Sequence, residues 1–113
     1  MELSIYWTKF AQNKLEEIKT YYLNKAGLRI ADELIEGIID RTIGLEKSPF
    51  SGQKEISLEH KPQKFRYLTY KNYKIIYWIN YDKNRIDIAT VFDSRQNPKK
   101  LSKIESELLN FIA

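Results

Sequence analysis

The strongest pattern along the chain is a pair of apolar runs separated by a short break. The first run, residues 73–79 (YKIIYWI), carries apolar side chains at both odd and even positions. Apolar residues on both faces are typical of a strand at the centre of a sheet. The second run, residues 85–92, follows the break at residues 81–84. Two runs of this composition so close together predict a β-hairpin.

Alternation in the second run predicts one apolar and one charged face, because neighbouring side chains of a strand point in opposite directions. The positions expected on the apolar face are Ile86, Ile88, Thr90 and Phe92. The positions of opposite parity are Arg85, Asp87, Asp93 and Arg95. The hairpin is therefore expected to pack one face on a core and to offer charged groups to a partner.

The N-terminal half has a different period. Residues 3–7 alternate, which predicts a short first strand, and Thr8 follows where a helix N-cap belongs. Apolar residues then recur at helical spacing, namely Ala11, Leu15, Ile18 and Tyr22. Gly27 is expected to end this helix in a left-handed conformation.

A second amphipathic helix follows at once. Its apolar stripe consists of Ala31, Leu34, Ile35, Ile38, Thr42 and Leu45. The tight connection between the two helices makes them antiparallel neighbours. The sequence PFSG at residues 49–52 ends the second helix and begins a loop.

The remaining segments complete the predicted order β-α-α-β-β-β-α. Residues 53–63 are polar and give no clear prediction, whereas residues 64–70 predict a strand before a turn at 71–72. After Pro98 the spacing is helical again, with Leu101, Ile104, Leu108, Phe111 and Ile112 on one stripe. We therefore predict an α+β fold for residues 1–113 as a single domain, in which the helical hairpin packs on one face of a small antiparallel sheet.

Composition excludes several kinds of site. The 113 residues include no cysteine and one histidine, so neither a disulfide, a thiolate zinc site nor a Ser-His-Asp triad is expected. The carboxylates of the two helices have the spacing of solvated helix faces, and we expect no metal and no cofactor. No apolar run is long enough to span a membrane and no secretory signal is recognisable, which predicts a cytoplasmic protein.

Charge is distributed unevenly along the chain. Residues 1–59 contain 8 basic and 10 acidic side chains, whereas residues 60–103 contain 11 basic and 3 acidic ones. An anionic partner would be attracted to the strand-rich half. Nucleic acid and an acidic segment of another protein both remain open as partners.

Several segments together resemble a known group of proteins. They are WTKFA at 7–11, LEKSPFSG at 45–52, FRYL at 65–68, YKIIY at 73–77 and VFDSRQNP at 91–98. In this order and spacing they are similar to the RelE/ParE superfamily of bacterial toxins from type II toxin–antitoxin modules. The resemblance covers essentially the whole chain.

This resemblance implies a growth-inhibiting toxin that a cognate antitoxin neutralises by wrapping its helices and sheet. RelE-like members cut mRNA in the ribosomal A site and are enzymes, whereas ParE-like members poison DNA gyrase. An antitoxin helix is expected to dock on the outward face of the helical hairpin if Ile30, Ile39 or Ile43 is exposed there.

The RNA-cutting reaction requires cations that hold the phosphate attacked by the 2′-OH and a group that moves protons. By resemblance, Lys74 and Arg95 occupy positions where such enzymes place phosphate-binding arginines. Leu101 stands where a tyrosine is often found, the lysine pair of the second strand is not clearly present, and His60 lies in the unassigned loop. These departures favour a ParE-like gyrase poison, with a RelE-like mRNA endonuclease as the alternative.

The candidate residues for binding an anion or the target are Arg66, Lys74, Arg95 and Lys99. The first three would also be the catalytic candidates in an RNA-cutting protein. A purely structural role is open for each of these three: an ion pair with Asp93 for Arg95, and cross-strand pairs for Arg66 and Lys74. We state as a hypothesis that Lys74 and Arg95 meet at one anion site.

Overall fold

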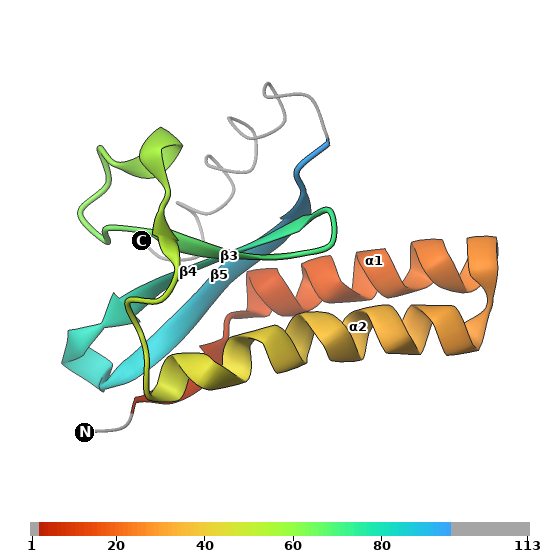
Figure 1. Cartoon of the computed structure of the whole chain (residues 1–113), viewed down its shortest axis with the longest axis horizontal. Helices are drawn as coiled ribbons and strands as arrows, with labels where there is room; N and C mark the ends of the chain where they lie inside the picture. Colours follow the sequence, from red (N-terminus) through yellow and green to blue (C-terminus); the bar gives the residue numbers. More distant parts are fainter. Residues whose placement is uncertain (1–2, 96–113) are drawn as a thin grey trace.

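The computed structural model describes residues 3–95, which form two helices beside one sheet (Figure 1). The helices are α1 (Lys9–Ala26) and α2 (Leu28–Ile43). The strands are β1 (Ser4–Trp7), β2 (Gln53–Lys54), β3 (Arg66–Tyr70), β4 (Tyr73–Asn80) and β5 (Arg85–Asp93). Short 3-10 turns lie at Gly44–Glu46, Ile56–Leu58 and Tyr81–Lys83. The helix predicted after Pro98 lies outside the described residues.

The strand order is β1-β5-β4-β3-β2, with β4 at the centre as its double-sided apolar pattern predicted. The pairs β2–β3, β3–β4 and β4–β5 are antiparallel, whereas β1 runs parallel to β5. The α+β prediction, with the helical hairpin on one face, is therefore confirmed. Two details differ from the prediction: β1 forms a parallel edge, and the two-residue strand β2 arises from the polar segment that gave no clear signal.

The ends of α1 show why the chain folds back here. Thr8 caps the helix, since its hydroxyl accepts a hydrogen bond from the Ala11 N–H at 3.1 Å. The same hydroxyl donates to the Ile88 carbonyl at 2.8 Å, which fixes the start of α1 to β5. Gly27 ends the helix with φ 93° and ψ 171°, a positive φ as expected but with an extended ψ. This backbone is essentially restricted to glycine, so the tight reversal depends on it.

One face of the sheet, which we call the helix face, is covered by the hairpin (Figure 1). Its fully buried members include Ile38 from α2, Ile75 and Tyr77 from β4, and Ile86 from β5. Contact is close at Gly37, where an added Cβ would overlap the Tyr70 phenol. The predicted helical stripes therefore face the core, and part of the packing requires a residue without a side chain.

The opposite face, which we call the loop face, carries a smaller cluster. Its buried members are Phe10, Leu58, Phe65, Ile76 and Ala89. Leu58 and Phe65 belong to residues 55–65, so the segment between β2 and β3 packs onto this side of the sheet. Within residues 3–95, no helix is long and apolar enough to cross a membrane.

A bulge in β5 corrects one prediction. Ile76 pairs with Thr90 while the next residue, Tyr77, pairs with Ile88, so Ala89 is an extra residue. The side-chain alternation shifts at this point. Ile86 and Ile88 pack in the helix-face cluster, but Phe92 packs against the loop-face cluster. The expectation that all of them share a face with Thr90 was therefore wrong.

Candidate functional site

Arg66 lies at the start of β3 and is bound to the loop that follows α2. Its guanidinium donates to the Gly52 carbonyl at 2.8 Å and to the Phe50 carbonyl at 3.3 Å. The same group lies 5.0 Å from the centre of the Phe50 ring. These contacts hold residues 50–52 against the sheet, so the structural role left open for Arg66 is carried by backbone carbonyls rather than by a cross-strand carboxylate.

Lys74 lies in the first half of β4 and belongs to a compact polar cluster. Its ammonium is 3.0 Å from a Glu55 carboxylate oxygen and 4.0 Å from the centre of the Tyr67 ring. The Ser57 hydroxyl donates to the other Glu55 oxygen at 3.1 Å. Glu55 is only 5% exposed, and a buried carboxylate needs such partners to replace the hydrogen bonds that it would make with water. The cluster combines a cation, a carboxylate and a phenol.

Arg95 follows β5 and forms a two-pronged ion pair with Asp93. Its Nη2 and Nε atoms lie 2.8 and 3.1 Å from the two carboxylate oxygens, and its backbone N–H donates to Asp93 at 2.9 Å. The side-chain hydrogen bonds from Arg95 lower the pKa of Asp93 below its usual value. Nearby, burial together with a hydrogen bond to Tyr22 raises the pKa of Tyr73. Arg95 therefore forms the ion pair with Asp93 that the sequence left open as its structural role.

The predicted cations do not converge. In the β4–β5 register Lys74 stands opposite Phe92, whereas its neighbour Tyr73 stands opposite Asp93. Neighbouring positions of a strand point to opposite faces, so Lys74 lies on the loop face and Asp93, with Arg95 bound to it, on the helix face. The hypothesis that Lys74 and Arg95 form one anion site was therefore wrong.

The other two candidates do not restore such a site. Arg66 pairs in register with Tyr77, which belongs to the helix-face cluster, and lies towards the opposite end of β4 from Lys74. Lys99 lies outside the described residues. Within residues 3–95, no group of three or more His, Cys, Asp or Glu side chains is arranged to hold a metal ion.

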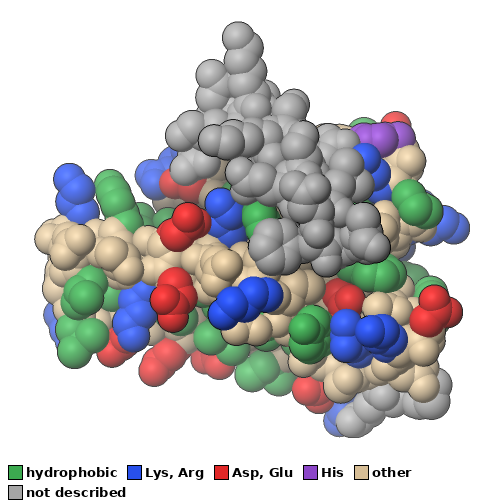
Figure 2. Space-filling view, turned by 180° about the vertical axis from the view of Figure 1, so that it is seen from behind, with side chains coloured by type: hydrophobic (Ala, Val, Ile, Leu, Met, Phe, Trp, Pro, Cys, Tyr) green, Lys and Arg blue, Asp and Glu red, His purple; other side chains and the backbone are tan. Residues whose placement is uncertain are grey.

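The outward side of the hairpin exposes apolar side chains, as expected for a docking surface. Ile30, Ile39 and Ile43 of α2 are 38%, 37% and 54% exposed. Figure 2, which views the molecule from behind, shows hydrophobic side chains interspersed with acidic and basic ones over the helical hairpin. Ile39 and Ile43 lie four residues apart and share one side of α2, whereas Ile30, nine residues before Ile39, points to the opposite side of the helix. We call Ile39 and Ile43 the hairpin surface.

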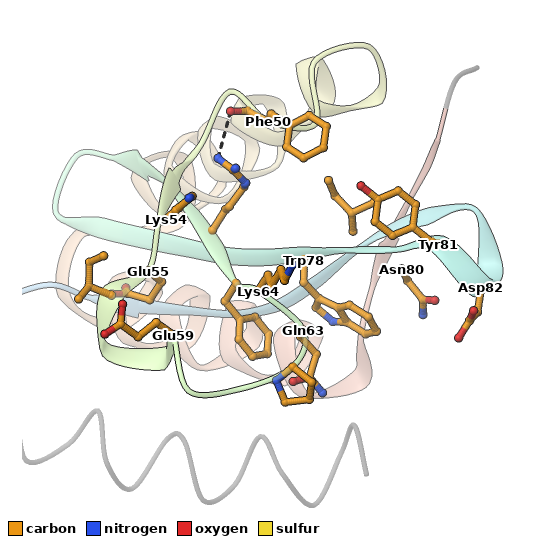
Figure 3. A pocket seen from close by; sticks show the side chains of 15 residues that line it. Phe50, Lys54, Glu55, Glu59, Gln63, Lys64, Trp78, Asn80, Tyr81 and Asp82 are labelled. Carbon is orange, nitrogen blue, oxygen red and sulfur yellow. Dashed lines mark hydrogen bonds between the residues drawn. The ribbon is translucent and has the colours of Figure 1, made fainter.

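A groove on the other side of the protein was not anticipated. It has a volume of about 760 Å³ and is lined by residues from the loop after α2, from the segment before β3 and from the end of β4 (Figure 3). Trp78 forms part of its wall, with Phe50 and Tyr81 near its rim. Sequence reasoning missed it because residues 53–63 have no periodicity.

The architecture of a helical hairpin packed on a small sheet is shared with solved structures of bacterial toxins. The ParE–ParD toxin–antitoxin system of Pseudomonas aeruginosa aligns with a TM-score of 0.68 at 19% identity, covering 81% of this chain and 96% of the other. A mutant of the Escherichia coli toxin RelE in the free state aligns with a TM-score of 0.64 at 13% identity, covering 100% of both chains.

A third structure, the RelBE2 toxin–antitoxin complex of Mycobacterium tuberculosis, aligns with a TM-score of 0.50 at 16% identity, covering 82% of this chain and 99% of the other. These likenesses establish the fold. The family follows from the sequence itself, since residues 5–98 match the ParE toxin of the type II toxin–antitoxin system parDE. The chain therefore belongs to the ParE toxin family. No protein with a curated functional description matches significantly.

Proposed function

We propose that this protein inhibits bacterial growth by poisoning DNA gyrase in the cytoplasm. The family match supports the toxin assignment. The observation that favours gyrase over RNA is the separation of the predicted cations. Lys74 is bound to Glu55 on one face, while Arg95 is bound to Asp93 on the other. Cleaving RNA requires several cations around a single phosphate, and these two do not provide that arrangement.

The experiment that tests this function gives the purified, antitoxin-free protein two substrates in parallel. One assay measures DNA supercoiling by gyrase, and the other measures mRNA integrity on programmed ribosomes. We expect loss of supercoiling with intact mRNA. Cleavage of the mRNA with unaffected supercoiling would contradict the proposal.

A cognate antitoxin is the second part of the proposed function. Ile39 and Ile43 of the hairpin surface are four residues apart on α2, so their side chains are neighbours on one side of the helix. Such a pair can receive the apolar face of a partner helix. We expect the protein encoded beside this gene to bind here and to rescue growth. Ile43→Asp should weaken that complex strongly, whereas Ile56→Asp, at a more exposed site away from the hairpin, should not. Failure of the neighbouring protein to bind or rescue would remove the main support for this partner.

Ribosome-dependent mRNA cleavage is the second candidate, because of the Lys74 cluster. Lys74, Glu55 and Tyr67 place a cation, a carboxylate and a phenol together on the loop face. These are the kinds of group that hold a phosphate and move a proton. If the ribosome assay shows cleavage, Lys74→Met should abolish it and Arg95→Gln should leave it largely intact.

A further inference from the structure

We propose that the groove on the loop face binds an extended peptide segment of the enzyme that this toxin poisons. This inference rests on the proposed function, since it assigns to gyrase a contact surface of its own. The hairpin surface is left to the antitoxin. Two partners would then use two opposite sides of one small sheet.

The rim of the groove is apolar and unusually exposed. Tyr81, Ile56 and Phe50 are 69%, 64% and 59% exposed, more than any other large apolar side chain of the described residues. All three line the same groove, although they come from separate segments of the chain. Apolar side chains gathered around one depression are typical of a surface that a partner covers.

The groove also contains polar atoms that lack partners. The Trp78 indole N–H and the Gln63 side-chain oxygen are both buried and make no hydrogen bond within the described structure. Both residues line the groove, and Figure 3 shows them in it. One is a donor and the other an acceptor. Neither atom is accessible as it stands, so each side chain must rotate on binding to pair with the carbonyl and the N–H of a peptide backbone. A purely apolar ligand would leave both unsatisfied.

The rim is held in place before any partner arrives. The buried Tyr77 phenol donates to the Pro49 carbonyl at 2.7 Å and accepts from the Gly52 N–H at 2.9 Å. Arg66, the register partner of Tyr77, also donates to the carbonyls of Phe50 and Gly52. Phe50 is therefore presented on a fixed loop, which lowers the entropy lost when a partner binds it.

Charge favours a polypeptide over a nucleic acid as the occupant. The cations Lys54 and Lys64 line the groove together with the carboxylates Glu59 and Asp82. A polyanion would meet carboxylates on this surface, whereas a protein segment of mixed charge could pair with both signs. Single-stranded nucleic acid, which also uses aromatic side chains, prefers a uniformly basic groove.

The test asks whether a change in the groove affects gyrase inhibition without affecting antitoxin binding. The variant Ile56→Ser/Tyr81→Ser removes two exposed side chains of the rim without disturbing the core. We expect it to need about tenfold more protein than the wild type to inhibit gyrase supercoiling, as for loss of a binding hot spot. Its affinity for the neighbouring-gene antitoxin should stay within about twofold of the wild type, because the hairpin surface is intact.

The matched control is Tyr21→Ser/Leu28→Ser at the hairpin tip, where the side chains are 55% and 58% exposed. It should inhibit supercoiling at the wild-type concentration. Trp78→Phe, which keeps a ring but removes the N–H donor, should give a smaller loss than the rim variant while retaining antitoxin binding.

The outcomes separate the two claims. If the wild type inhibits gyrase and the rim variant does so equally well, the groove proposal is overturned and the proposed function stands. If the wild type leaves supercoiling unaffected, both fail. Loss of antitoxin binding together with inhibition in the rim variant would overturn the separate role of the groove.

Discussion

The two faces of the sheet differ in what they bury. The helix face is closed by the hairpin over a large, mainly apolar cluster. The loop face has a smaller apolar cluster, and charged groups are buried beside it. Glu55 and Asp87 are 5% and 3% exposed, and both depend on nearby basic side chains. One side of the molecule is built mainly for stability, which leaves the other side free to hold polar groups and a groove.

Asp87 illustrates the difference. Its carboxylate accepts from Arg85 Nε at 2.6 Å and from the Asn80 amide at 3.1 Å, and the Arg85 guanidinium lies 3.9 Å from the centre of the Tyr6 ring. The charge is satisfied by neighbours on the sheet. Burying charged groups seldom adds net stability, so a face that contains them is less stabilising per residue than an apolar one.

The largest loss of stability is expected when a buried side chain of the helix face is truncated. Ile38→Ala should lower the free energy of unfolding by about 2–5 kcal/mol, because a fully buried side chain leaves a cavity. Ile39→Ala, one residue further on and 37% exposed, should cost less than about 1 kcal/mol. Urea unfolding of the two variants measures the difference. Equal losses would mean that the assignment of the buried stripe is incorrect.

A smaller effect is expected where the two sides of the molecule are joined. Tyr77→Phe removes the phenol that binds Pro49 and Gly52, and should cost about 1–3 kcal/mol, since the Gly52 N–H is left without its partner. Thermal unfolding at neutral pH measures the loss. Unchanged stability would contradict the role of this phenol in fixing the Phe50 loop.

The same tyrosine predicts a response to alkaline pH. Burial raises the pKa of Tyr77 above its usual value near 10. A raised pKa in the folded state means that its contribution is complete below about pH 10 and is lost as the pH rises further. Tyr77→Phe should therefore flatten the fall in stability above pH 10, as followed by unfolding at several pH values.

The loop face should tolerate more change. Lys74→Met leaves the Glu55 carboxylate without its cation and should cost about 1 kcal/mol, because the lysine is partly exposed and solvent screens the pair. The double variant Lys74→Met/Glu55→Gln should recover part of that loss. A double-mutant cycle gives the coupling free energy, and a value of zero would show that the pair contributes no stability.

The smallest effect concerns the exposed pair after β5. Arg95→Gln should raise the pKa of Asp93 towards its ordinary value, because the hydrogen bonds from Arg95 are what lower it. Because the pKa of Asp93 is lowered in the folded protein, the ion pair stabilises the fold at pH values above the unfolded pKa near 4. This contribution is lost as the pH falls through the pKa of the folded state. NMR titration of the Asp93 carboxyl in the wild type and the variant measures this. An unchanged pKa would mean that the ion pair does not form in solution.

The main lines of the fold follow from sequence periodicity. The stripes of α1 and α2 and the double-sided pattern of β4 each reflect which side chains are buried, and burial is what periodicity records. The segment before β3 has no period because it folds through specific contacts, such as the Glu55 N–H to the Phe65 carbonyl at 2.9 Å. The bulge at Ala89 leaves no periodic signal either, so the face of Phe92 was assigned incorrectly.

The candidate site was less predictable than the fold. The sequence shows which residues carry a charge, but the register between strands decides which of these side chains lie on the same face. Asp93 stands opposite Tyr73 and not opposite Lys74, and this difference of one residue puts Lys74 and Asp93 on opposite faces of the sheet. The groove combines Phe50 from the loop after α2 with Trp78 near the end of β4 and Tyr81 just after it. Its shape depends on Arg66 binding backbone carbonyls, which no sequence pattern encodes.

The most direct test of the central claim is gyrase supercoiling in a titration with the antitoxin-free protein, followed by addition of the antitoxin encoded beside its gene. The account predicts that supercoiling falls as the protein is added and recovers as antitoxin reaches an equal amount. Supercoiling that stays unchanged throughout the titration, with the protein folded and able to bind its antitoxin, would contradict it.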